Sequence, residues 1–247
     1  LGTITFKNCD LTDLGSKGVF LKDHNKLEKV LFVNCKCSST LKFANLPELM
    51  FVENEGGTMF YGYEFTKCFG KKLIRTICPY DFQIDGIRYH GNLFCAKNLM
   101  FDDCNMTEYA VVYHSLLSDL YWTSDCLTIK GCKNLTSIDI EGQMNIYNGL
   151  YKMTEDPLPY VDMRKIGLQD LPALQKLSIV SVGLREFEPS LSWSAIKSVN
   201  VKNNRLTGTV PGWIEAVKGV LGQEWLNYDR KYDYFVGEHV PKDNFAM

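Results

Sequence analysis

Nine cysteines are the residues of this sequence that could carry the most chemistry, and all of them lie within its first 132 positions. A thiolate can ligate zinc, act as a nucleophile or form a disulfide. Zinc sites gather cysteines and histidines at short spacings such as CxxC. The only tight pair here is Cys35-Lys36-Cys37, where the chain is expected to bend. We therefore predict no metal site and no bound cofactor, and interpret the cysteines as disulfide or packing residues.

The four histidines, which are common general bases in enzymes, are scattered at His24, His90, His114 and His239. His114, Ser115 and Asp119 have the residue types of a catalytic triad, but adjacent side chains diverge and seldom supply two members of one. The sequence has no GxSxG, no HExxH and no phosphate-binding glycine loop. We predict no catalytic residues and a protein that is not an enzyme. The alternative is a site hidden within 57–95 or 107–160.

Charge and composition exclude further classes of partner. The formal net charge is -2, and no cluster of Lys and Arg forms the footprint that nucleic-acid binding needs. No apolar run reaches the ~18–20 residues that span a bilayer.

The chain begins with Leu1, which is expected after removal of a secretory signal, and it contains the sequons Asn105-Met106-Thr107 and Asn134-Leu135-Thr136. We predict a secreted, extracellular, disulfide-bonded glycoprotein with sugars on Asn105 and Asn134.

The elements that must position any functional site are indicated by a repeated spacing of apolar residues. In IKSVNVKNNRL, apolar residues at Ile196, Val199 and Val201 are followed by Asn204 and Leu206, which gives offsets of 0, 3, 5, 8 and 10. Neither the period of a strand nor that of a helix fits these offsets. They favour a strand that turns sharply, with each of these side chains in one narrow core. Similar runs begin at Leu1, Leu27, Leu46, Ala96 and Leu174.

These runs resemble the leucine-rich repeat, LxxLxLxx(N/C)xL, in which each coil is a strand plus a return arc. The resemblance implies an α/β solenoid of about eight or nine coils: a horseshoe with a parallel concave β-sheet and an irregular convex side. We expect an irregular array over residues 1–210. Ile129 and Ile140 are 11 residues apart, so only one of them is expected to centre a strand. The repeat register in 57–95 and 107–160 stays unassigned.

The ninth place of the repeat takes Asn or Cys because the chain bends there, and an inward polar side chain can bond the exposed backbone groups. The residues in this structural place are Cys9, Cys35, Cys104, Cys132 and Asn204. Disulfides Cys9–Cys35 and Cys104–Cys132 between neighbouring coils stay possible. The better disulfide candidates are the cysteines outside the ninth place: Cys37, Cys68, Cys78, Cys95 and Cys126. Their pairing is open, and the odd count leaves at least one thiol over or paired with another chain.

The C-terminal segment 211–247 is expected to cap the array. Pro211-Gly212 ends the repeat, and Trp213, Val217, Leu221 and Trp225 then recur at helical spacing. Solenoids need such caps because the last coil otherwise exposes its core. The residues after this helix, rich in tyrosine, are expected to form an extended aromatic tail.

The outward places of the concave sheet are the predicted binding surface. We take as binding candidates Asn34, Glu53, Asp102, Asp103, Ser181, Lys202 and Asn203. A mixed polar and apolar surface of this kind suits protein recognition, although such residues can also be merely soluble.

The resemblance implies a binding module for an extracellular protein, namely a surface receptor, an immune factor or a matrix or cuticle protein, and its Phe-rich strands look more like invertebrate secreted members. A structural protein that self-associates through an exposed coil edge or an unpaired cysteine, for example as a homodimer, is the alternative.

Overall fold

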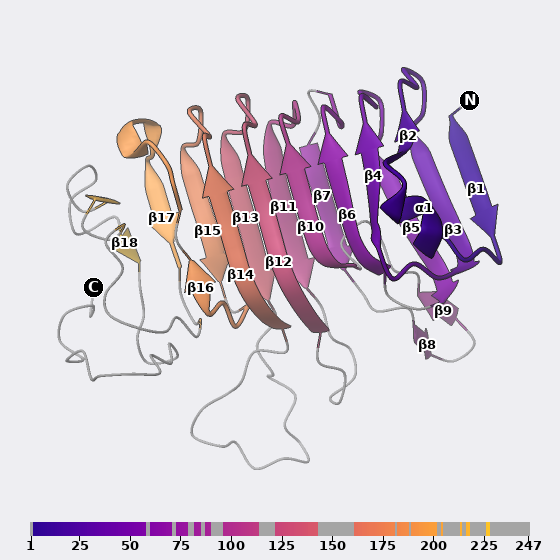
Figure 1. Ribbon diagram of the computed structural model, residues 1–247. Coiled ribbons are helices and arrows are strands. Elements are labelled where there is room, and N and C mark those ends of the chain that lie inside the picture. The colour runs from indigo at the N-terminus through magenta and orange to yellow at the C-terminus, as the bar shows by residue number, and fades with distance from the viewer. Residues whose placement is uncertain are drawn as a thin grey trace, which may run out of the picture.

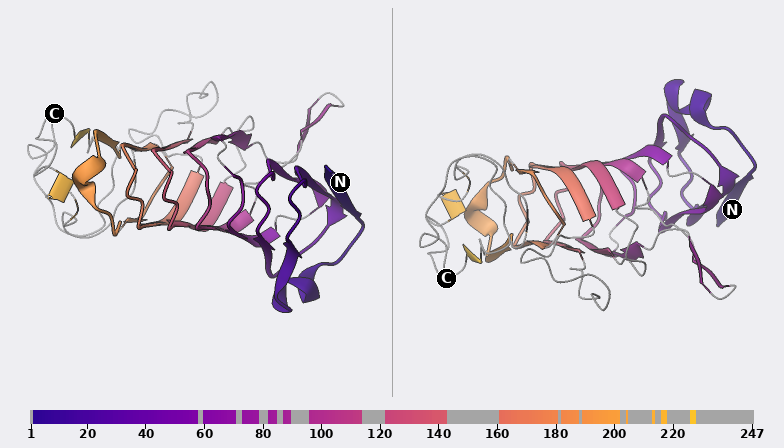
Figure 2. Two further views of the ribbon diagram at one scale, coloured as in Figure 1. Left: turned by 90° about the horizontal axis from the view of Figure 1, so that it is seen from above. Right: turned by 90° about the horizontal axis from the view of Figure 1, so that it is seen from below.

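The chain forms a flattened solenoid of parallel strands in the computed structural model (Figure 1). The residues that the structure describes are 2–57, 60–70, 73–78, 82–84, 87–89, 96–113, 122–142, 161–180, 182–187, 189–201, 204, 213, 216–217 and 226–227. Successive strands alternate between two facing layers, which Figure 2 shows from above and below. Each coil therefore contributes one strand to each layer.

One layer is a seven-stranded parallel sheet with the strand order β16-β14-β12-β10-β6-β4-β2. In chain order its strands are β2 (Val19–Lys22), β4 (Thr40–Ala44), β6 (Phe60–Thr66), β10 (Ala96–Asp102), β12 (Trp122–Lys130), β14 (Val161–Gln169) and β16 (Glu186–Phe187).

The other layer consists of a three-stranded sheet, β1-β3-β5, and a six-stranded sheet in the order β18-β17-β15-β13-β11-β7. Its strands are β1 (Thr3–Lys7), β3 (Lys29–Cys35), β5 (Phe51–Gly57), β7 (Leu73–Cys78), β11 (Glu108–Tyr113), β13 (Ser137–Gly142), β15 (Lys176–Val180), β17 (Ser198–Asn200) and β18 (Leu226–Asn227). The remaining elements are the helix α1 (Thr12–Ser16), the antiparallel pair β8 (Phe82–Ile84) and β9 (Ile87–Tyr89), and the 3-10 helix η1 (Trp193–Ala195).

A left-handed residue at the end of a strand explains the unusual spacing of the repeat. In β3, Val30 and Phe32 point into the core by ordinary alternation. Asn34 then adopts a φ of 51°, which breaks the alternation and turns the buried Cys35 inward. Left-handed residues likewise follow strands of the seven-stranded sheet, at Asp23, Asn45, Lys67, Asp103 and Asp170. Each of these is a corner of the solenoid.

Backbone hydrogen bonds tie each corner to the next coil. The N–H of Asn45 donates to the carbonyl of Thr66 at 2.9 Å, and the N–H of Asp103 donates to the carbonyl of Lys130 at 3.0 Å. The strand ladders thus continue through the corners, where an unpaired buried N–H would be costly. The result is a hydrogen-bonded frame that is continuous in the seven-stranded sheet and divided between β5 and β7 in the other layer.

The expectation of a solenoid of parallel strands is met, but its return arm differs from the irregular one predicted. The return arm is itself a strand, so seven coils, from β1–β2 to β15–β16, already hold fourteen strands of the two layers. Ile129 and Ile140 both centre strands, β12 and β13, because these two strands belong to opposite layers. The prediction that only one of them could do so is wrong.

One copy of the repeat is also shifted from its predicted register. Phe32 pairs with Asn54 rather than with Phe51, so the third coil begins its pattern at the buried Leu49. Phe51, which was assigned to the core, is 49% exposed. The copy at 96–106 has the expected inward residues, Leu99 and Phe101, but lies in the seven-stranded sheet, not beside β5.

Most of the predicted cap lies outside the described residues. Trp213 and Val217 are helical and buried, and the Trp213 ring contacts Phe187 and Trp193 at 5.1 and 6.1 Å between ring centres. The described part of the chain holds no helix long and apolar enough to cross a membrane.

Candidate functional site

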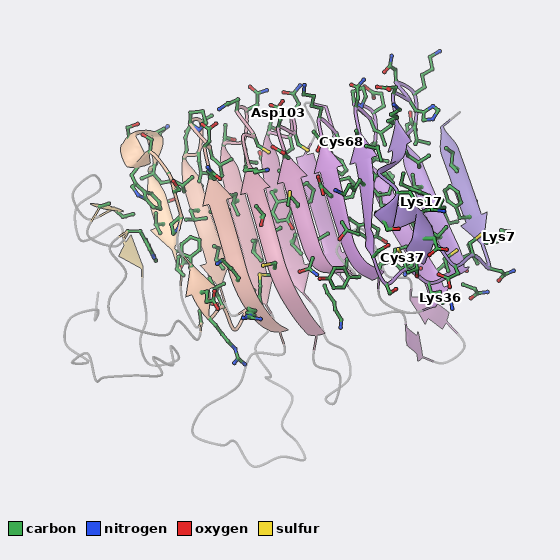
Figure 3. All side chains as sticks on the ribbon, in the orientation of Figure 1. Lys7, Lys17, Lys36, Cys37, Cys68 and Asp103 are labelled. Carbon is green, nitrogen blue, oxygen red and sulfur yellow. The ribbon has the colours of Figure 1, made fainter. Side chains whose placement is uncertain are left out.

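A cavity of about 630 Å³ opens where the first coils turn from one layer to the other. We call it the corner cavity. Its lining is polar, and its residues come from successive coils: Asp10, Thr12, Asp13, Lys36, Cys37, Ser38, Tyr61 and Lys97. Figure 3 labels Lys36 and Cys37 near the start of the solenoid. The stacking of coils thus places side chains up to 87 positions apart around one hollow.

An ion pair occupies one wall of the corner cavity. The Lys36 ammonium lies 2.9 Å from a carboxylate oxygen of Asp10, and the two side chains are 66% and 51% exposed. The N–H of Thr12 donates to the other carboxylate oxygen at 3.1 Å. The hydrogen bond from Lys36, aided by those from Thr12, lowers the pKa of Asp10 to about 2. The carboxylate therefore stays ionised at every ordinary pH.

Hydrogen bonds between coils hold the remaining walls in place. Both the N–H and the hydroxyl of Ser38 lie 3.2 Å from the hydroxyl oxygen of Thr12. The N–H of Tyr61 donates to the carbonyl of Cys37 at 3.0 Å, and the Asn98 amide donates to the carbonyl of Tyr61 at 3.1 Å. The cavity thus offers both charges, hydroxyls and a phenol ring in fixed positions, which suits binding of a polar surface.

Exposed apolar side chains gather in the same coils. Among the described residues, the large apolar side chains that face solvent are Leu14, Val19, Met50, Phe51 and Tyr61, each between 44% and 49% exposed. Tyr61 lines the corner cavity, and Leu14 follows its lining residue Asp13. The described part of residues 96–201 has no comparable side chain. Exposed apolar side chains with a polar rim are typical of interaction sites.

The residues predicted for a concave binding face do not lie on one face. Glu53 points outward from β5 and its carboxylate lies 2.6 Å from the Lys29 ammonium. Asp102 points outward from the opposite layer, 3.1 Å from the ammonium of Lys130. Their separation follows directly from the placement of β10 in the seven-stranded sheet.

The other predicted surface residues also lie apart. Asn34 and Asp103 are left-handed residues in different layers, since Asn34 is the last residue but one of β3 and Asp103 follows β10. The Asn34 amide donates to the side chain of Asn8 at 3.4 Å. Ser181, Lys202 and Asn203 lie outside the described residues.

The ninth-place cysteines point inward and donate to backbone carbonyls. The Cys35 thiol lies 3.4 Å from the carbonyl oxygen of Val33 and 3.5 Å from that of Phe6 in the preceding coil. Cys104 donates in the same way to Phe65, at 3.4 Å. Cys9 and Cys132 each bond the carbonyl two residues earlier, that of Lys7 and that of Lys130.

Cys68, a predicted disulfide candidate, belongs to the same set of inward cysteines that donate to backbone carbonyls. Its thiol bonds the carbonyl of Thr66 at 3.4 Å, and burial raises its pKa to about 11. The sequence holds the signal for this, because Phe60, Tyr63, Phe65 and Cys68 repeat the offsets 0, 3, 5 and 8 with aromatic residues.

Seven cysteines are described by the structure as thiols: Cys9, Cys35, Cys37, Cys68, Cys104, Cys126 and Cys132. Cys37 is buried and bonds the carbonyl of Ser39 at 3.1 Å, whereas Cys126 is half-buried on β12. The side chain of Cys78, on β7, and the whole of Cys95 lie outside the described residues.

Asn204 hydrogen-bonds the backbone groups at the bend of the preceding coil, which has no polar side chain of its own at the ninth place. Its side chain is fully buried; the oxygen accepts from the N–H groups of Val182 and Leu184, and the amide donates to the carbonyl of Ile179 at 2.8 Å. Val182 occupies the ninth place of its own coil and cannot make these bonds. The neighbouring coil therefore supplies them.

No group of three or more potential metal ligands occurs among the described residues. His24 is described and exposed. The other three histidines, together with Ser115 and Asp119, lie outside the described residues.

The corner cavity has no signal in the sequence that could be recognised in advance, since its lining depends on how coils of unequal length stack.

Comparisons of the chain with protein-family models, with curated proteins and with solved structures give no significant match.

Proposed function

We propose that this chain is a secreted, non-enzymatic module that binds an extracellular protein, and that its coils are divergent leucine-rich repeats. The observation that carries the proposal is that the large exposed apolar side chains of the described residues all lie in the coils formed by residues 2–70, where Tyr61 lines the corner cavity and Leu14 adjoins it. Protein interfaces combine an apolar centre with a polar rim in this way. The partner class is a surface receptor, an immune factor or a matrix or cuticle protein.

The hydrogen-bonded pairing of the strands supports this proposal. The described strands are joined by ladders in both layers, and cross-strand ion pairs order their outer faces, as Lys42 and Glu64 do at 3.4 Å. A surface whose side chains are already ordered loses less entropy when a partner docks. The described coils therefore suit recognition by a preformed surface.

The test is capture of a partner by the full chain from the extracellular proteins of its source, followed by identification and a binding measurement with the purified partner. Two variants, Tyr61→Ser and Lys36→Ser, remove exposed side chains from the corner cavity without touching the core. Lys133→Ser is the matched control, because Lys133 is also exposed and ion-paired, with Asp170, but lies at another corner.

Weaker binding by both cavity variants, with unchanged binding by Lys133→Ser, supports the proposal. Equal binding by all three would place the binding site elsewhere on the chain. Capture of only further copies of the same chain would favour the alternative, a structural protein that self-associates through a coil edge.

A further inference from the structure

The acceptor asparagines of the two sequons lie against each other in the folded chain. Asn105 and Asn134 belong to adjacent coils and occupy equivalent corners after β10 and β12. Both are exposed, and the amide nitrogen of Asn134 donates to the side-chain oxygen of Asn105 at 2.7 Å. Their separation of 29 positions in the sequence hides this proximity.

The remainder of each sequon is also engaged between these coils. The hydroxyl of Thr136 donates to the carbonyl of Thr107 at 2.9 Å, and the N–H of Thr136 donates to the same oxygen at 2.8 Å. Beneath them, the buried Cys104 and Cys132 anchor the two corners. The two exposed asparagines are therefore held side by side on a fixed backbone, since the middle residues of the sequons, Met106 and Leu135, are fully buried.

We propose that Asn105 and Asn134 form a paired glycan site, in which two N-linked oligosaccharides leave adjacent coils side by side and hinder each other's trimming. The inference rests on the proposed passage of the chain through the secretory route. Its ligand class is a lipid-diphosphate-linked oligosaccharide, the donor for asparagine modification.

The covalent step balances without an oxidant or a reductant. The amide nitrogen of the asparagine forms a bond to C1 of the first sugar, the bond between C1 and the diphosphate oxygen breaks, and the lipid diphosphate leaves with the bonding pair. A base of the transferase takes one amide proton. In the folded chain the Asn134 amide and the Thr136 hydroxyl are already hydrogen-bonded, so transfer precedes the docking of the two coils.

Both modifications are compatible with the folded corner. A glycosylated asparagine keeps one N–H and its carbonyl oxygen, so Asn134 can still donate to Asn105. The two first sugars then start from coils that are about 4.8 Å apart, the ordinary spacing of neighbouring strands. An N-linked glycan is bulky. Each glycan therefore blocks the approach of trimming enzymes to the other.

The test uses the full chain secreted from cultured eukaryotic cells behind a foreign signal sequence. Parent chain, Asn105→Gln and Asn134→Gln are compared by intact mass and by an endoglycosidase that removes only untrimmed glycans. We expect two glycans on the parent and one on each variant, with a clear rise in the endoglycosidase-resistant fraction when the neighbouring glycan is absent. Thr136 is left unchanged because its hydroxyl also joins the coils.

Asn45→Gln is the matched control. Asn45 is another exposed corner asparagine, bonded to Asp23 at 2.8 Å, but it precedes Leu46-Pro47 and is not a sequon. It should change neither mass nor trimming. Thermal melting of each variant after enzymatic removal of its glycans checks that the fold is kept.

A parent chain with fewer than two glycans overturns the paired site, as does equal trimming of parent and single variants. The foreign signal delivers the chain to the transferase wherever its natural location lies. A bare chain therefore contradicts the paired site alone, whereas failure to bind an extracellular partner contradicts the proposed function.

Discussion

The coils of residues 2–70 and those of residues 96–201 use the same backbone plan but fill it differently. In the first region stacked rings form the core: Phe43 and Phe65 are 5.1 Å apart between ring centres, and Phe6 and Phe32 are 5.5 Å apart. In the second region this run of rings ends at Phe101 and Tyr109, and in β12 to β15 Ile, Leu and Val take the equivalent places, as Ile138 and Ile140 do. The difference teaches that the corners and ladders define a coil, while its inner residues are exchangeable in kind.

The two regions also differ at their surfaces. Residues 2–70 carry the exposed apolar side chains and all of the corner cavity's lining except Lys97, whereas residues 96–201 carry both sequons. Outward ion pairs occur in both regions, as Lys42 with Glu64 and Asp139 with Lys176 show. Under the proposed function, the first region contacts the partner and the second remains in solvent.

The largest expected effect is that of Phe65→Ala. Phe65 is fully buried, and its ring lies 4.9 Å from that of Phe69 and 5.4 Å from that of Phe101. Its loss should lower the free energy of unfolding by about 3–5 kcal/mol. Leu168→Ala, at an inward place of the aliphatic region, should cost less because no ring contacts are lost. Urea unfolding measures both, and a greater loss for Leu168→Ala would contradict the distinction between the two cores.

Asn204→Ala should rank second. It leaves two N–H groups and one carbonyl of the preceding coil without their partner, and an unsatisfied buried group costs about 1–3 kcal/mol. Cys104→Ala, at the same place of another coil, removes only a weak donor. Chemical denaturation of both variants compares an asparagine corner with a cysteine corner. Equal losses would mean that the polar bonds of Asn204 contribute nothing beyond filling space.

Gly15→Ala should have a smaller effect, confined to the first region. An added Cβ would contact the Ser39 side chain and lie 2.8 Å from the carbonyl oxygen of Thr40, so α1 must move away from β4. Overpacking of this kind costs about 1–3 kcal/mol. Gly167→Ala is the counterpart in the second region, where the nearest atom is 3.7 Å away, and it should be neutral or slightly stabilising. Thermal melting of the two variants would refute the packing of α1 if both melted like the parent.

The smallest effect concerns the charge of the corner cavity. Lys36→Ser should raise the pKa of Asp10 from about 2 toward the ordinary 3.8, because the largest cause of the lowering is the Lys36 hydrogen bond. A lowered carboxyl pKa stabilises the fold above pH 3.8, and this contribution is lost as the pH falls through about 2. Carboxyl NMR titration measures the shift. Tyr61→Ser is the control and should leave the Asp10 titration unchanged.

Much of the solenoid could be predicted from its sequence because its repeat has a local physical cause. An inward residue at the ninth place requires a left-handed corner before it, and Asn34-Cys35 and Asp103-Cys104 satisfy both needs with adjacent residues. The apolar offsets therefore identify strands and bends with little help from the rest of the chain. They also identify Leu177 and Ile179 as core residues, and both are fully buried.

The two-layer arrangement could not be predicted from the same offsets. A strand in either layer buries the same pattern, so the copies at Leu99 and at Leu177 look alike although they lie in opposite layers. Only the short interval between Ile129 and Ile140 is a sign in the sequence that successive strands lie in different layers. The predicted concave face depends on the assumption that every copy of the repeat lies in one sheet. On that assumption Glu53 and Asp102 share a face, but in the structure they lie in opposite layers.

The corner cavity was missed for a related reason. Its lining depends on the relative positions of Asp10, Lys36 and Tyr61, which are set by the lengths of the connections between strands. Those lengths vary from coil to coil and leave no periodic signal. A surface site in such a protein becomes visible only when strand pairing is known.

The corners at which one layer passes to the other give this architecture an unusual freedom to grow. The sequence holds 18 residues between Gly142, the end of β13, and Val161, the start of β14, yet β13 still pairs with β15 and β12 with β14 in unbroken register. The entropy of closing a loop rises only slowly with its length. Natural variation, or a protein engineer, can therefore graft a peptide or a whole domain at such a corner and leave the stack on either side intact.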